Sequence, residues 1–228
     1  MHHKPIENGW IEVICGSMFC GKTEELLRRL RRAKIANLKV KAFKAKIDNR
    51  YSKDKIVSHD KNTIDSIPLS YSSDLFDLGN QYDVVGIDEA QFFDDDLVTV
   101  CKNLAKNNTR VIIAGLDKDY KGLPFGPMPL IMCEADYLDK LSAICMKCGK
   151  DASHTQRTTT QTEQILIGEA DAYEARCRGC FNLDKNNKIF FFTFFGSGFS
   201  PTTETILFAL SKMTRRPCKS SSRAWMRK

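Results

Sequence analysis

Short apolar runs and helically spaced apolar residues alternate along the first half of the chain. Trp10–Cys15 is a run of apolar and β-branched residues, which predicts a buried strand. From Glu24 to Ala36, leucine and alanine recur three and four residues apart, which predicts an amphipathic helix. Leu38–Lys44 predicts a second strand. A strand, a helix and a further strand are the unit from which parallel sheets are built.

The same alternation continues to residue 115. Tyr82–Glu89 is an apolar strand that ends in two acids, and Arg110–Gly115 is another buried strand. Between them, Asp94–Asn107 predicts a helix whose acidic first turn suits the positive end of the helix dipole. Weaker patterns predict a short strand at Thr63–Leu69 and a short helix at Tyr71–Leu78. We therefore expect a doubly wound α/β sheet with its site at the carboxyl ends of the strands.

Two segments interrupt this pattern. Residues 45–63 are polar and have no clear period, and we expect them to form a loop that lies over the site. Residues 117–129 contain two glycines and three prolines, which also predicts a loop.

The eight residues that follow the first predicted strand fit the pattern G-x-x-x-x-G-K-[ST] at every fixed position. They lie between a strand and a helix, which is the context of a phosphate-binding loop. Glycines there let backbone N–H groups converge on an anion, and the helix N-terminus adds its positive dipole end. Lys22 is expected to reach the β and γ phosphates, and the Thr23 hydroxyl to bind Mg²⁺. The expected ATP-binding residues of this loop are Gly16, Ser17, Met18, Phe19, Cys20, Gly21, Lys22 and Thr23.

Two adjacent acids follow the apolar strand near residue 85. Asp88 fits the second acidic site of P-loop enzymes, which holds Mg²⁺ directly or through water. Glu89 has two chemical roles open to it: it orients a water in an ATPase, or it accepts the proton of a substrate hydroxyl in a kinase. The phosphate loop and the acids predict nucleoside triphosphate chemistry without naming the acceptor.

Four cysteines form two C-x-x-C pairs, Cys145 with Cys148 and Cys177 with Cys180. Two such turns complete a tetrahedral zinc site, and we favour zinc over a redox dithiol because two pairs are present. The 28 residues between the pairs exceed the usual spacing, so zinc would hold both ends of a long polar loop that acts as a lid. We expect the remaining cysteines of the body to be small buried hydrophobes: Cys15, Cys20, Cys101 and Cys133.

The net charge of +7 belongs to one end of the chain. Residues 1–180 carry 26 basic and 26 acidic side chains, whereas residues 181–228 carry nine basic and two acidic ones. A neutral body argues against a nucleic-acid partner. The basic face of the first helix is interpreted as solvated and not as a partner surface; it comprises Arg28, Arg29, Arg31, Arg32 and Lys34.

Membrane and export signals are absent from the sequence. There is no run of 18 uncharged apolar residues, so we expect no transmembrane helix and no membrane partner. The N-terminus lacks the apolar region of a signal peptide. Nine cysteines without an export signal point to thiols or metal ligands and to a cytoplasmic protein.

Residues 182–228 form an atypical tail that is basic and rich in phenylalanine. Ile189–Phe195 is too short to span a bilayer, and Thr203–Arg216 has the pattern of an amphipathic basic helix that would touch an anionic membrane. We favour a poorly ordered extension over that membrane contact.

The phosphate loop, the segment Ile87–Phe93, the triplet Pro124–Gly126 and the paired C-x-x-C motifs together resemble the thymidine kinase family shared by bacteria, poxviruses and animal cytosol. The resemblance covers about residues 8–181. It implies a RecA-like P-loop domain at 8–140 and a zinc-binding domain with a lasso loop at 141–181. It also implies transfer of the γ-phosphate of ATP to the 5′-hydroxyl of thymidine or deoxyuridine, a homotetramer, and inhibition by thymidine triphosphate.

The resemblance also implies roles for individual residues. Glu89 is the general base, with Arg50 beside it on the transferring phosphate. The family's base-edge contacts are backbone groups near Arg157–Thr160 and 166–169. Thr23 and Asp88 serve Mg²⁺, and Asp88, Glu89, Ala90 and Gln91 complete the ATP-binding set. The implied substrate-binding residues are Met18, Asp48, Phe92, Leu116, Tyr120, Phe125, Leu166, Ile167, Gly168, Glu169 and Tyr173.

Two other classes of protein share some of these features. A P-loop ATPase motor or repair factor would use Glu89 to activate water and would respond to DNA, which the neutral body argues against. A zinc-ribbon binding module that holds ATP only as a ligand leaves Glu89 without a role.

Overall fold

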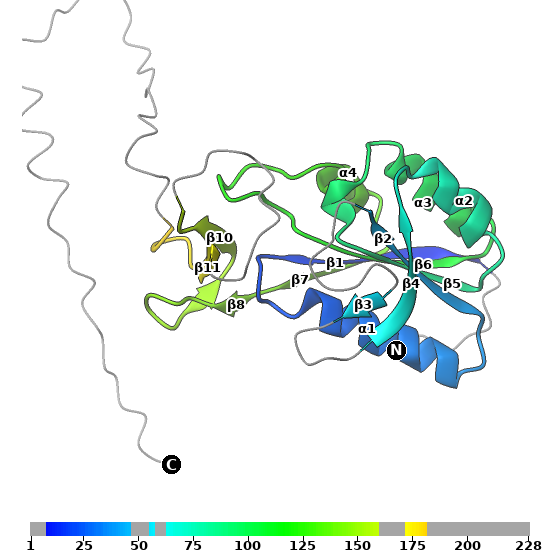
Figure 1. The fold of residues 1–228 in the computed structure, drawn as a ribbon, viewed down its shortest axis with the longest axis horizontal. Coiled ribbons are helices and arrows are strands. Elements are labelled where there is room, and N and C mark those ends of the chain that lie inside the picture. Colours follow the sequence, from blue (N-terminus) through cyan, green and yellow to red (C-terminus); the bar gives the residue numbers. More distant parts are fainter. Residues whose placement is uncertain (1–7, 47–54, 58–62, 160–171, 182–228) are drawn as a thin grey trace, which may run out of the picture. The chain divides into compact units, whose positions relative to one another are not determined.

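Seven strands form the main sheet in the computed structural model, which describes residues 8–46, 55–57, 63–159 and 172–181 (Figure 1). All neighbouring strands run parallel except β3 and β4, which are antiparallel. In spatial order the strands are β3 (Lys55–Val57), β4 (Thr63–Leu69), β2 (Val40–Ala45), β5 (Val84–Asp88), β6 (Arg110–Gly115), β1 (Trp10–Gly16) and β7 (Tyr137–Leu141).

Helices cover both faces of this sheet, as the alternation of elements predicted. Helix α1 lies on one face, and α2, α3 and α4 lie on the other (Figure 1). Their bounds are α1 (Lys22–Ile35), α2 (Ser73–Gly79), α3 (Leu97–Lys106) and α4 (Met128–Cys133), with a short 3₁₀ helix η1 (Ala90–Phe92) after β5. The expected α/β class with a parallel sheet is confirmed.

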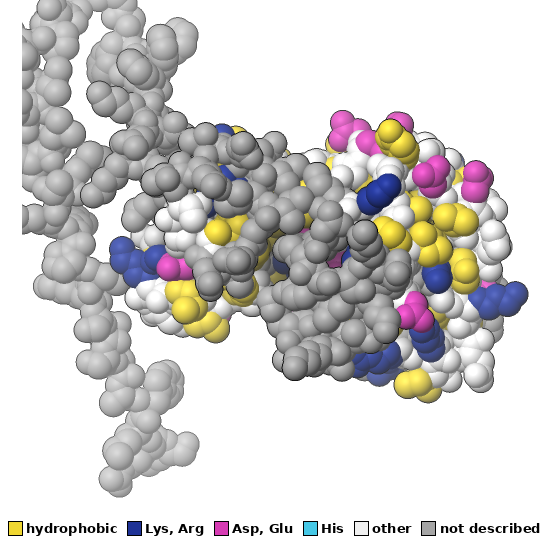
Figure 2. Space-filling model, viewed as in Figure 1, with side chains coloured by type: hydrophobic (Ala, Val, Ile, Leu, Met, Phe, Trp, Pro, Cys, Tyr) yellow, Lys and Arg dark blue, Asp and Glu magenta, His cyan; other side chains and the backbone are white. Residues whose placement is uncertain are grey.

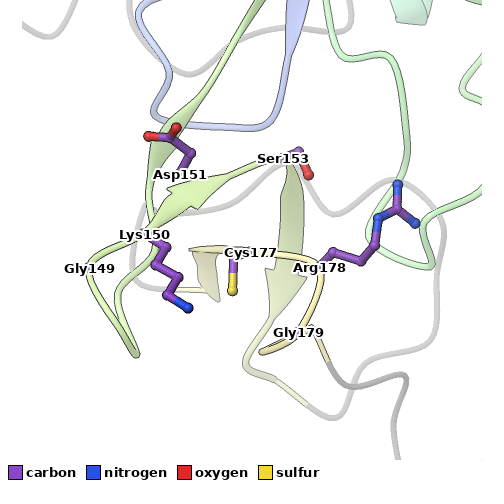
Figure 3. A pocket seen from close by; sticks show the side chains of 7 residues that line it. All are labelled: Gly149, Lys150, Asp151, Ser153, Cys177, Arg178 and Gly179. Carbon is purple, nitrogen blue, oxygen red and sulfur yellow. The ribbon is translucent and has the colours of Figure 1, made fainter. Parts of the chain in front are cut away.

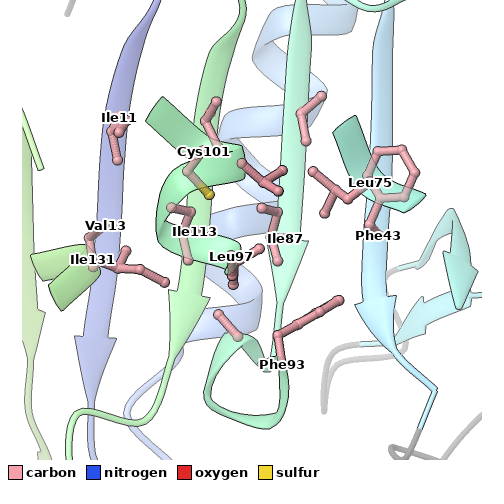
Figure 4. Packing of buried hydrophobic residues seen from close by; sticks show 14 of the residues in the cluster. Ile11, Val13, Phe43, Leu75, Ile87, Phe93, Leu97, Cys101, Ile113 and Ile131 are labelled. Atoms are coloured by element: carbon pink, nitrogen blue, oxygen red, sulfur yellow. The ribbon is translucent and has the colours of Figure 1, made fainter. Parts of the chain in front are cut away.

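The central strands are apolar on both sides because both faces are covered. Val13 and Ile113 point to the side of α3, where they pack with Leu97 and other side chains of the larger core (Figure 4). Their neighbours Ile14 and Ile112 point to the side of α1. A residue and its successor in a strand face opposite ways, so continuous apolar runs fill two cores at once.

The position of β6 determines where the site forms. It pairs with β1 from Trp10↔Arg110 to Cys15↔Gly115, and on its other edge it pairs with β5. The carboxyl ends of β1 and β5 therefore lie at the same edge of the sheet, separated by one strand. The phosphate loop leaves β1 at this edge, and the two acids leave β5 there.

Four short strands beyond β7 form two antiparallel pairs. They are β8 (Ala143–Ile144) with β9 (Asp151–Ala152), and β10 (His154–Arg157) with β11 (Tyr173–Arg176). A small cluster of buried residues joins them, namely Ala143, Cys145, Ala152 and Ala175. We name residues 143–159 and 172–181 the cysteine module.

Several expectations need correction. The segment 45–63 is not wholly a loop, because β3 lies within it. Residues 47–54 and 58–62 of this segment lie outside the described part of the chain. The loop 117–129 ends in the first turn of α4. Strand β7 was not predicted, because it is an edge strand with mostly exposed side chains and so lacks an apolar run.

The basic face of α1 is not simply solvated. Arg29 has a side chain that is only 13% exposed, and it donates to Glu12 on β1, Glu25 on its own helix and Asp139 on β7, at 2.8, 2.7 and 2.5 Å. Arg110 on β6 also donates to Glu12, at 2.6 Å. One arginine thus ties α1 to two strands, which sequence spacing alone does not reveal.

Charges of both signs occur together on the surface. Figure 2 shows acidic and basic side chains on the same face of the described residues, which agrees with the neutral charge balance of the body. Among the helices described, none is long and apolar enough to cross a membrane.

Replacing Glu12 by glutamine should destabilise the protein by about 3 kcal/mol, because two arginines lose a buried anion. Burial alone would raise the pKa of Glu12, but Arg110, Trp10 and Arg29 outweigh it and hold the pKa below 4.5. Its contribution is therefore present above pH 4.5 and is lost as the pH falls through the lowered pKa. Guanidinium unfolding at fixed protein concentration, at pH 7 and pH 3, measures both effects.

The matched control is Glu134→Gln, because Glu134 pairs with Lys102 and its side chain is 41% exposed. It should change the free energy of unfolding by less than about 1 kcal/mol. Equal losses in the two variants would contradict a special role for the buried pair.

Candidate active site

The phosphate loop has the backbone conformation that its glycines permit. Gly16 and Gly21 have φ of 145° and 84°, in the left-handed region where other residues are strained. A Cβ on Gly16 would also lie 2.3 Å from the carbonyl oxygen of Leu141, at the end of β7. The first glycine of the motif is therefore required both by its dihedral angle and by its contact with β7.

Lys22 and Thr23 begin α1 and lie at the carboxyl edge of the sheet. The Lys22 ammonium donates to the carbonyl oxygen of Ser17 at 2.8 Å, so it lies across its own loop. The Thr23 hydroxyl lies 3.3 and 3.4 Å from the two carboxylate oxygens of Asp88. Asp88 shares the α1-facing side of β5 with Val84, which explains why it meets Thr23.

The hydroxyl of Thr23 and the carboxylate of Asp88 fit Mg²⁺. Both are hard oxygen donors, and Mg²⁺ in phosphate-transfer enzymes takes one or two protein oxygens while phosphates and waters complete its shell. Two such donors face each other beside the phosphate loop, so this pair would hold the ion.

Glu89 is held in a strained position directly after β5. Its φ and ψ are 52° and 43°, a left-handed conformation that is uncommon outside glycine, and its N–H donates to Asp88 Oδ1 at 3.0 Å. Gln91 Nε2 donates to Glu89 Oε2 at 2.5 Å. Backbone strain at a carboxylate that is also hydrogen-bonded by a side chain is typical of a functional residue.

Gln91 orients Glu89, a role that the sequence did not predict. Its side chain is buried, and its Oε1 accepts the N–H of Leu116 at 2.9 Å while its amide nitrogen donates to Glu89. The residue therefore links the end of β5 to the end of β6. We had expected Gln91 only as part of an ATP-binding run, and its neighbour Ala90 is fully buried in the larger core.

The loop after β6 approaches Gln91 from the other side. Gly126 has φ of 50°, and a Cβ there would lie 2.3 Å from the carbonyl oxygen of Gln91. The preceding residue, Phe125, packs edge-on against Phe92 with ring centroids 5.7 Å apart. Two of the expected nucleoside-contacting aromatics are thus brought together beside Glu89.

Asp119 gives this loop its shape. Its carboxylate Oδ1 accepts the N–H groups of Lys121 and Leu123, at 2.8 and 2.9 Å, and its own N–H donates to the carbonyl oxygen of Leu123. Tyr120 lies inside this turn. The Asp-x-x-Gly spacing of residues 119–122 is a turn signal that predicts such a side-chain contact.

The cysteine module contacts the phosphate loop. Ser17 Oγ donates to the carbonyl oxygen of Ala152 at 3.2 Å, and the N–H of Met18 donates to Thr155 Oγ1 at 3.0 Å. Cys20 packs against the small cluster inside the module. The loop that would bind phosphate is therefore walled on one side by β9 and β10.

The four cysteines of the two C-x-x-C pairs come together. Their sulfur atoms all lie within 4.8 Å of one another, and Cys148 Sγ lies 3.6 Å from Cys177 Sγ. Four sulfurs at about 2.3 Å from a central Zn²⁺ lie roughly 3.8 Å apart, so the cluster fits a tetrahedral zinc site. The ligands would be Cys145, Cys148, Cys177 and Cys180.

The acidity of these thiols differs with their surroundings. Burial alone would raise the pKa of Cys145, but the backbone N–H groups of Cys177, Lys147 and Cys148 outweigh it and lower the pKa to about 6. The neighbouring thiols Cys148 and Cys177 raise the pKa of Cys180 to about 12. A cation at the centre removes this conflict, because it stabilises all four thiolates.

A pocket lined in part by Cys177 lies beside the cluster. Figure 3 shows the side chains of Cys177 and Lys150 among those that line it. Its lining contains no residue of the phosphate loop: it consists of Gly149, Lys150, Asp151, Ser153, Cys177, Arg178 and Gly179. Since these side chains include no buried charged group, we assign it no ligand.

The other cysteines only partly match the expectation of buried hydrophobes. Cys15 and Cys101 are buried, and burial raises the pKa of Cys101 to about 12. Cys20 is half-buried. Cys133 is exposed, because it ends α4 on the side away from the core, so the expectation was wrong there.

Several expected site residues lie outside the described residues. They are Asp48, Arg50, Thr160, Leu166, Ile167, Gly168 and Glu169. Of the remaining nucleoside-contacting set, Met18 and Leu116 make the backbone hydrogen bonds given above. Tyr120 and Tyr173 both contact the side chain of Arg157. We had expected only backbone contacts near Arg157 and had not predicted a role for its side chain.

Among solved structures, the flagellar accessory protein FlaH from Methanocaldococcus jannaschii is similar to this chain at 15% identity. The match covers 63% of this chain and 75% of that chain, with a TM-score of 0.44. At this level of likeness we draw no argument from it.

Sequence comparison is far more specific. The sequence model of the thymidine kinase family matches residues 9–181. Thymidine kinases of Rhodothermus sp. (strain ITI 518) and Bacteroides fragilis (strain YCH46) are each 56% identical to this chain over 173 residues. The match spans 76% of this chain and 81% and 87% of those relatives. The chain therefore belongs to the thymidine kinase family.

Proposed function

We propose that this chain is a thymidine kinase, which transfers the γ-phosphate of ATP to the 5′-hydroxyl of thymidine. The observation that carries the proposal is the arrangement at one sheet edge in a chain of this family. Glu89 lies next to Asp88 and is oriented by Gln91. Phe92, which follows shortly after Glu89 in the chain, packs against Phe125.

Glu89 would accept the proton of the substrate hydroxyl during the reaction. As the 5′-oxygen of thymidine bonds to the γ-phosphorus, the bond from that phosphorus to the β,γ-bridging oxygen breaks and ADP leaves. The hydroxyl proton passes to the Glu89 carboxylate. The Gln91 amide holds one Glu89 oxygen, which supports presentation of the other oxygen to the substrate.

The phosphate loop would hold the triphosphate during this step. Lys22 now lies on the Ser17 carbonyl, and its flexible stem allows it to reach the β and γ phosphates instead. Thr23 and Asp88 would hold Mg²⁺, which when bound neutralises charge on the phosphates. Positioning and charge stabilisation supply most of the catalysis in phosphoryl transfer.

Aromatic walls suit a neutral nucleoside, which needs apolar contact and a few polar groups. We propose Phe92, Tyr120, Phe125 and Tyr173 as these walls, with Met18 and Leu116 at the thymine methyl. From the family resemblance we also propose Arg50 and Asp48 near the reacting groups and backbone contacts from residues 157–160 and 166–169. Discrimination against deoxyuridine rests on one methyl group and should be modest.

Further properties follow from membership of the family as expectations. We propose a P-loop domain at 8–140, a zinc-binding domain at 141–181 and a separate tail at 182–228. We also propose a cytoplasmic homotetramer that thymidine triphosphate inhibits. The predictions for the tail concern residues outside the described part of the chain.

Replacing Glu89 by glutamine should lower kcat for thymidine phosphorylation at least about 100-fold, because the general base is lost. The KM for ATP should change less than about two-fold, because the phosphate loop is intact. Transfer of labelled γ-phosphate to thymidine, deoxycytidine and water, measured in parallel, tests this.

Glu134→Gln is the control for the same chemical change at an exposed site. Release of free phosphate at equal rates with and without thymidine in the wild-type protein would favour an ATPase instead.

Gly126→Ala should lower kcat by at least about ten-fold, because the added Cβ displaces the Gln91 carbonyl and with it the group that orients Glu89. Gly149→Ala is a close control. Gly149 also has a positive φ, of 72°, but an added Cβ meets nothing within 4 Å. If both alanine variants lose the same activity while their zinc content is unchanged, backbone strain and not the Gln91 contact is responsible.

Replacing Cys148 by serine should remove the bound metal and loosen the wall of the phosphate loop. We expect about one zinc per chain in the wild-type protein and much less in the variant, with weaker ATP binding. Elemental analysis and equilibrium ATP binding measure the two effects. Cys133→Ser, at an exposed cysteine outside the cluster, should retain full zinc content. Equal zinc in both variants would argue against a four-cysteine site.

A further inference from the structure

Arg157 contacts two of the aromatic residues in the proposed nucleoside pocket. It ends β10 and is 3% exposed, and its guanidinium carbon lies 3.6 Å from the ring centroid of Tyr120. Its Nη2 donates to the Tyr173 hydroxyl at 2.7 Å, and the same guanidinium lies 5.2 Å from the Tyr173 ring. One buried cation therefore contacts two rings from segments that are more than 50 residues apart in the sequence.

Backbone structure holds both tyrosines in place beside Arg157. Arg157 and Tyr173 are cross-strand partners in the β10–β11 pair, and the next backbone hydrogen bond, from Thr158 to Ala172, continues that pairing at 2.9 Å. Tyr120 lies in the turn that Asp119 holds. This turn is attached to the cysteine module by Lys118, which donates to the carbonyl oxygen of Ser153 at 3.1 Å.

The chemistry of these contacts suits arginine and not lysine. A planar guanidinium stacks on an aromatic face and donates in its plane at the same time, and it does so at a lower desolvation cost than an ammonium. A lysine at residue 157 would make a point contact with one ring or the other. Tyr120 and Tyr173 would then lose the common group that fixes their separation.

We infer that Arg157 is a positioning residue that holds Tyr120 and Tyr173 as walls of the nucleoside pocket. The inference rests on the proposed function, since the two tyrosines are assigned there to thymidine. Because these walls contact the nucleoside and not the reacting atoms, Arg157 acts on substrate binding. Loss of uniform binding raises KM and leaves kcat nearly unchanged.

The test is steady-state kinetics of the full chain with Arg157→Lys, Tyr173→Phe and the double variant. Arg157→Lys should raise the KM for thymidine about ten-fold, with kcat and the KM for ATP within about two-fold of wild type. Tyr173→Phe, which removes the hydroxyl that accepts from Arg157, should raise the same KM by a smaller factor. The double variant should be no worse than about the larger single effect, because both changes remove one shared contact.

Arg176→Lys is the matched control. Arg176 lies on the neighbouring strand β11 and pairs with Glu174 on its own strand. It should leave the KM for thymidine within about two-fold of wild type. Zinc content and thermal midpoint are measured for every variant, so that a general loss of structure is recognised.

Three results would overturn the inference: an unchanged KM for thymidine in Arg157→Lys, equal rises in KM for both substrates, or factors that multiply in the double variant. If Arg157→Lys does not fold, Tyr173→Phe decides, and an unchanged KM for thymidine there overturns it. A wild-type protein that does not phosphorylate thymidine would overturn the proposed function and this inference together. Normal wild-type turnover with an unaffected Arg157→Lys overturns the inference alone.

Discussion

The parallel register of β1, β6 and β5 is the constraint on which the site depends. These strands are apolar on both faces, and helices cover both faces, so their pairing is fixed by two cores at once. Parallel strands end at the same edge. The phosphate loop after β1 and the acids after β5 therefore meet across the width of one strand. The chemistry of Lys22, Thr23, Asp88 and Glu89 follows from that meeting, although 65 residues separate Thr23 from Asp88 in the chain.

Close backbone packing around Gln91 then fixes the direction in which the Glu89 carboxylate points. Glu89 adopts a left-handed conformation, and Gln91 holds its side chain while also binding the backbone of Leu116. Gly126 approaches the Gln91 carbonyl more closely than any side chain permits. Strain at a single residue costs of order 1–3 kcal/mol, and the hydrogen bonds and packing around Gln91 offset it. The arrangement therefore fixes the direction of the Glu89 carboxylate, which suits the general base proposed above.

The cysteine module belongs to the site as much as the sheet does. It contacts the phosphate loop through Ala152 and Thr155, and it reaches the loop of Tyr120 through Ser153 and Arg157. A metal held by the four cysteines would therefore support a wall of the proposed ATP site and a wall of the proposed nucleoside pocket together. Such support would explain a structural metal in a chain whose main sheet already has two cores.

The sequence by itself determined the family, the α/β class, the phosphate loop, the pair of acids and the four clustered cysteines. Local patterns predict these features: apolar runs, a glycine-rich motif and fixed cysteine spacing. Each pattern is formed by residues that are close together in the chain. Only the tertiary structure decided the partners. It placed Arg29 in a buried ion-pair network, gave Gln91 two hydrogen-bonding roles, required glycine at 126, and set Arg157 between two tyrosines. It also added β7, which the sequence does not predict because this exposed edge strand has no apolar run. Such contacts join residues that are distant in sequence, so their distances and angles exist only once the sheet and the cysteine module have folded.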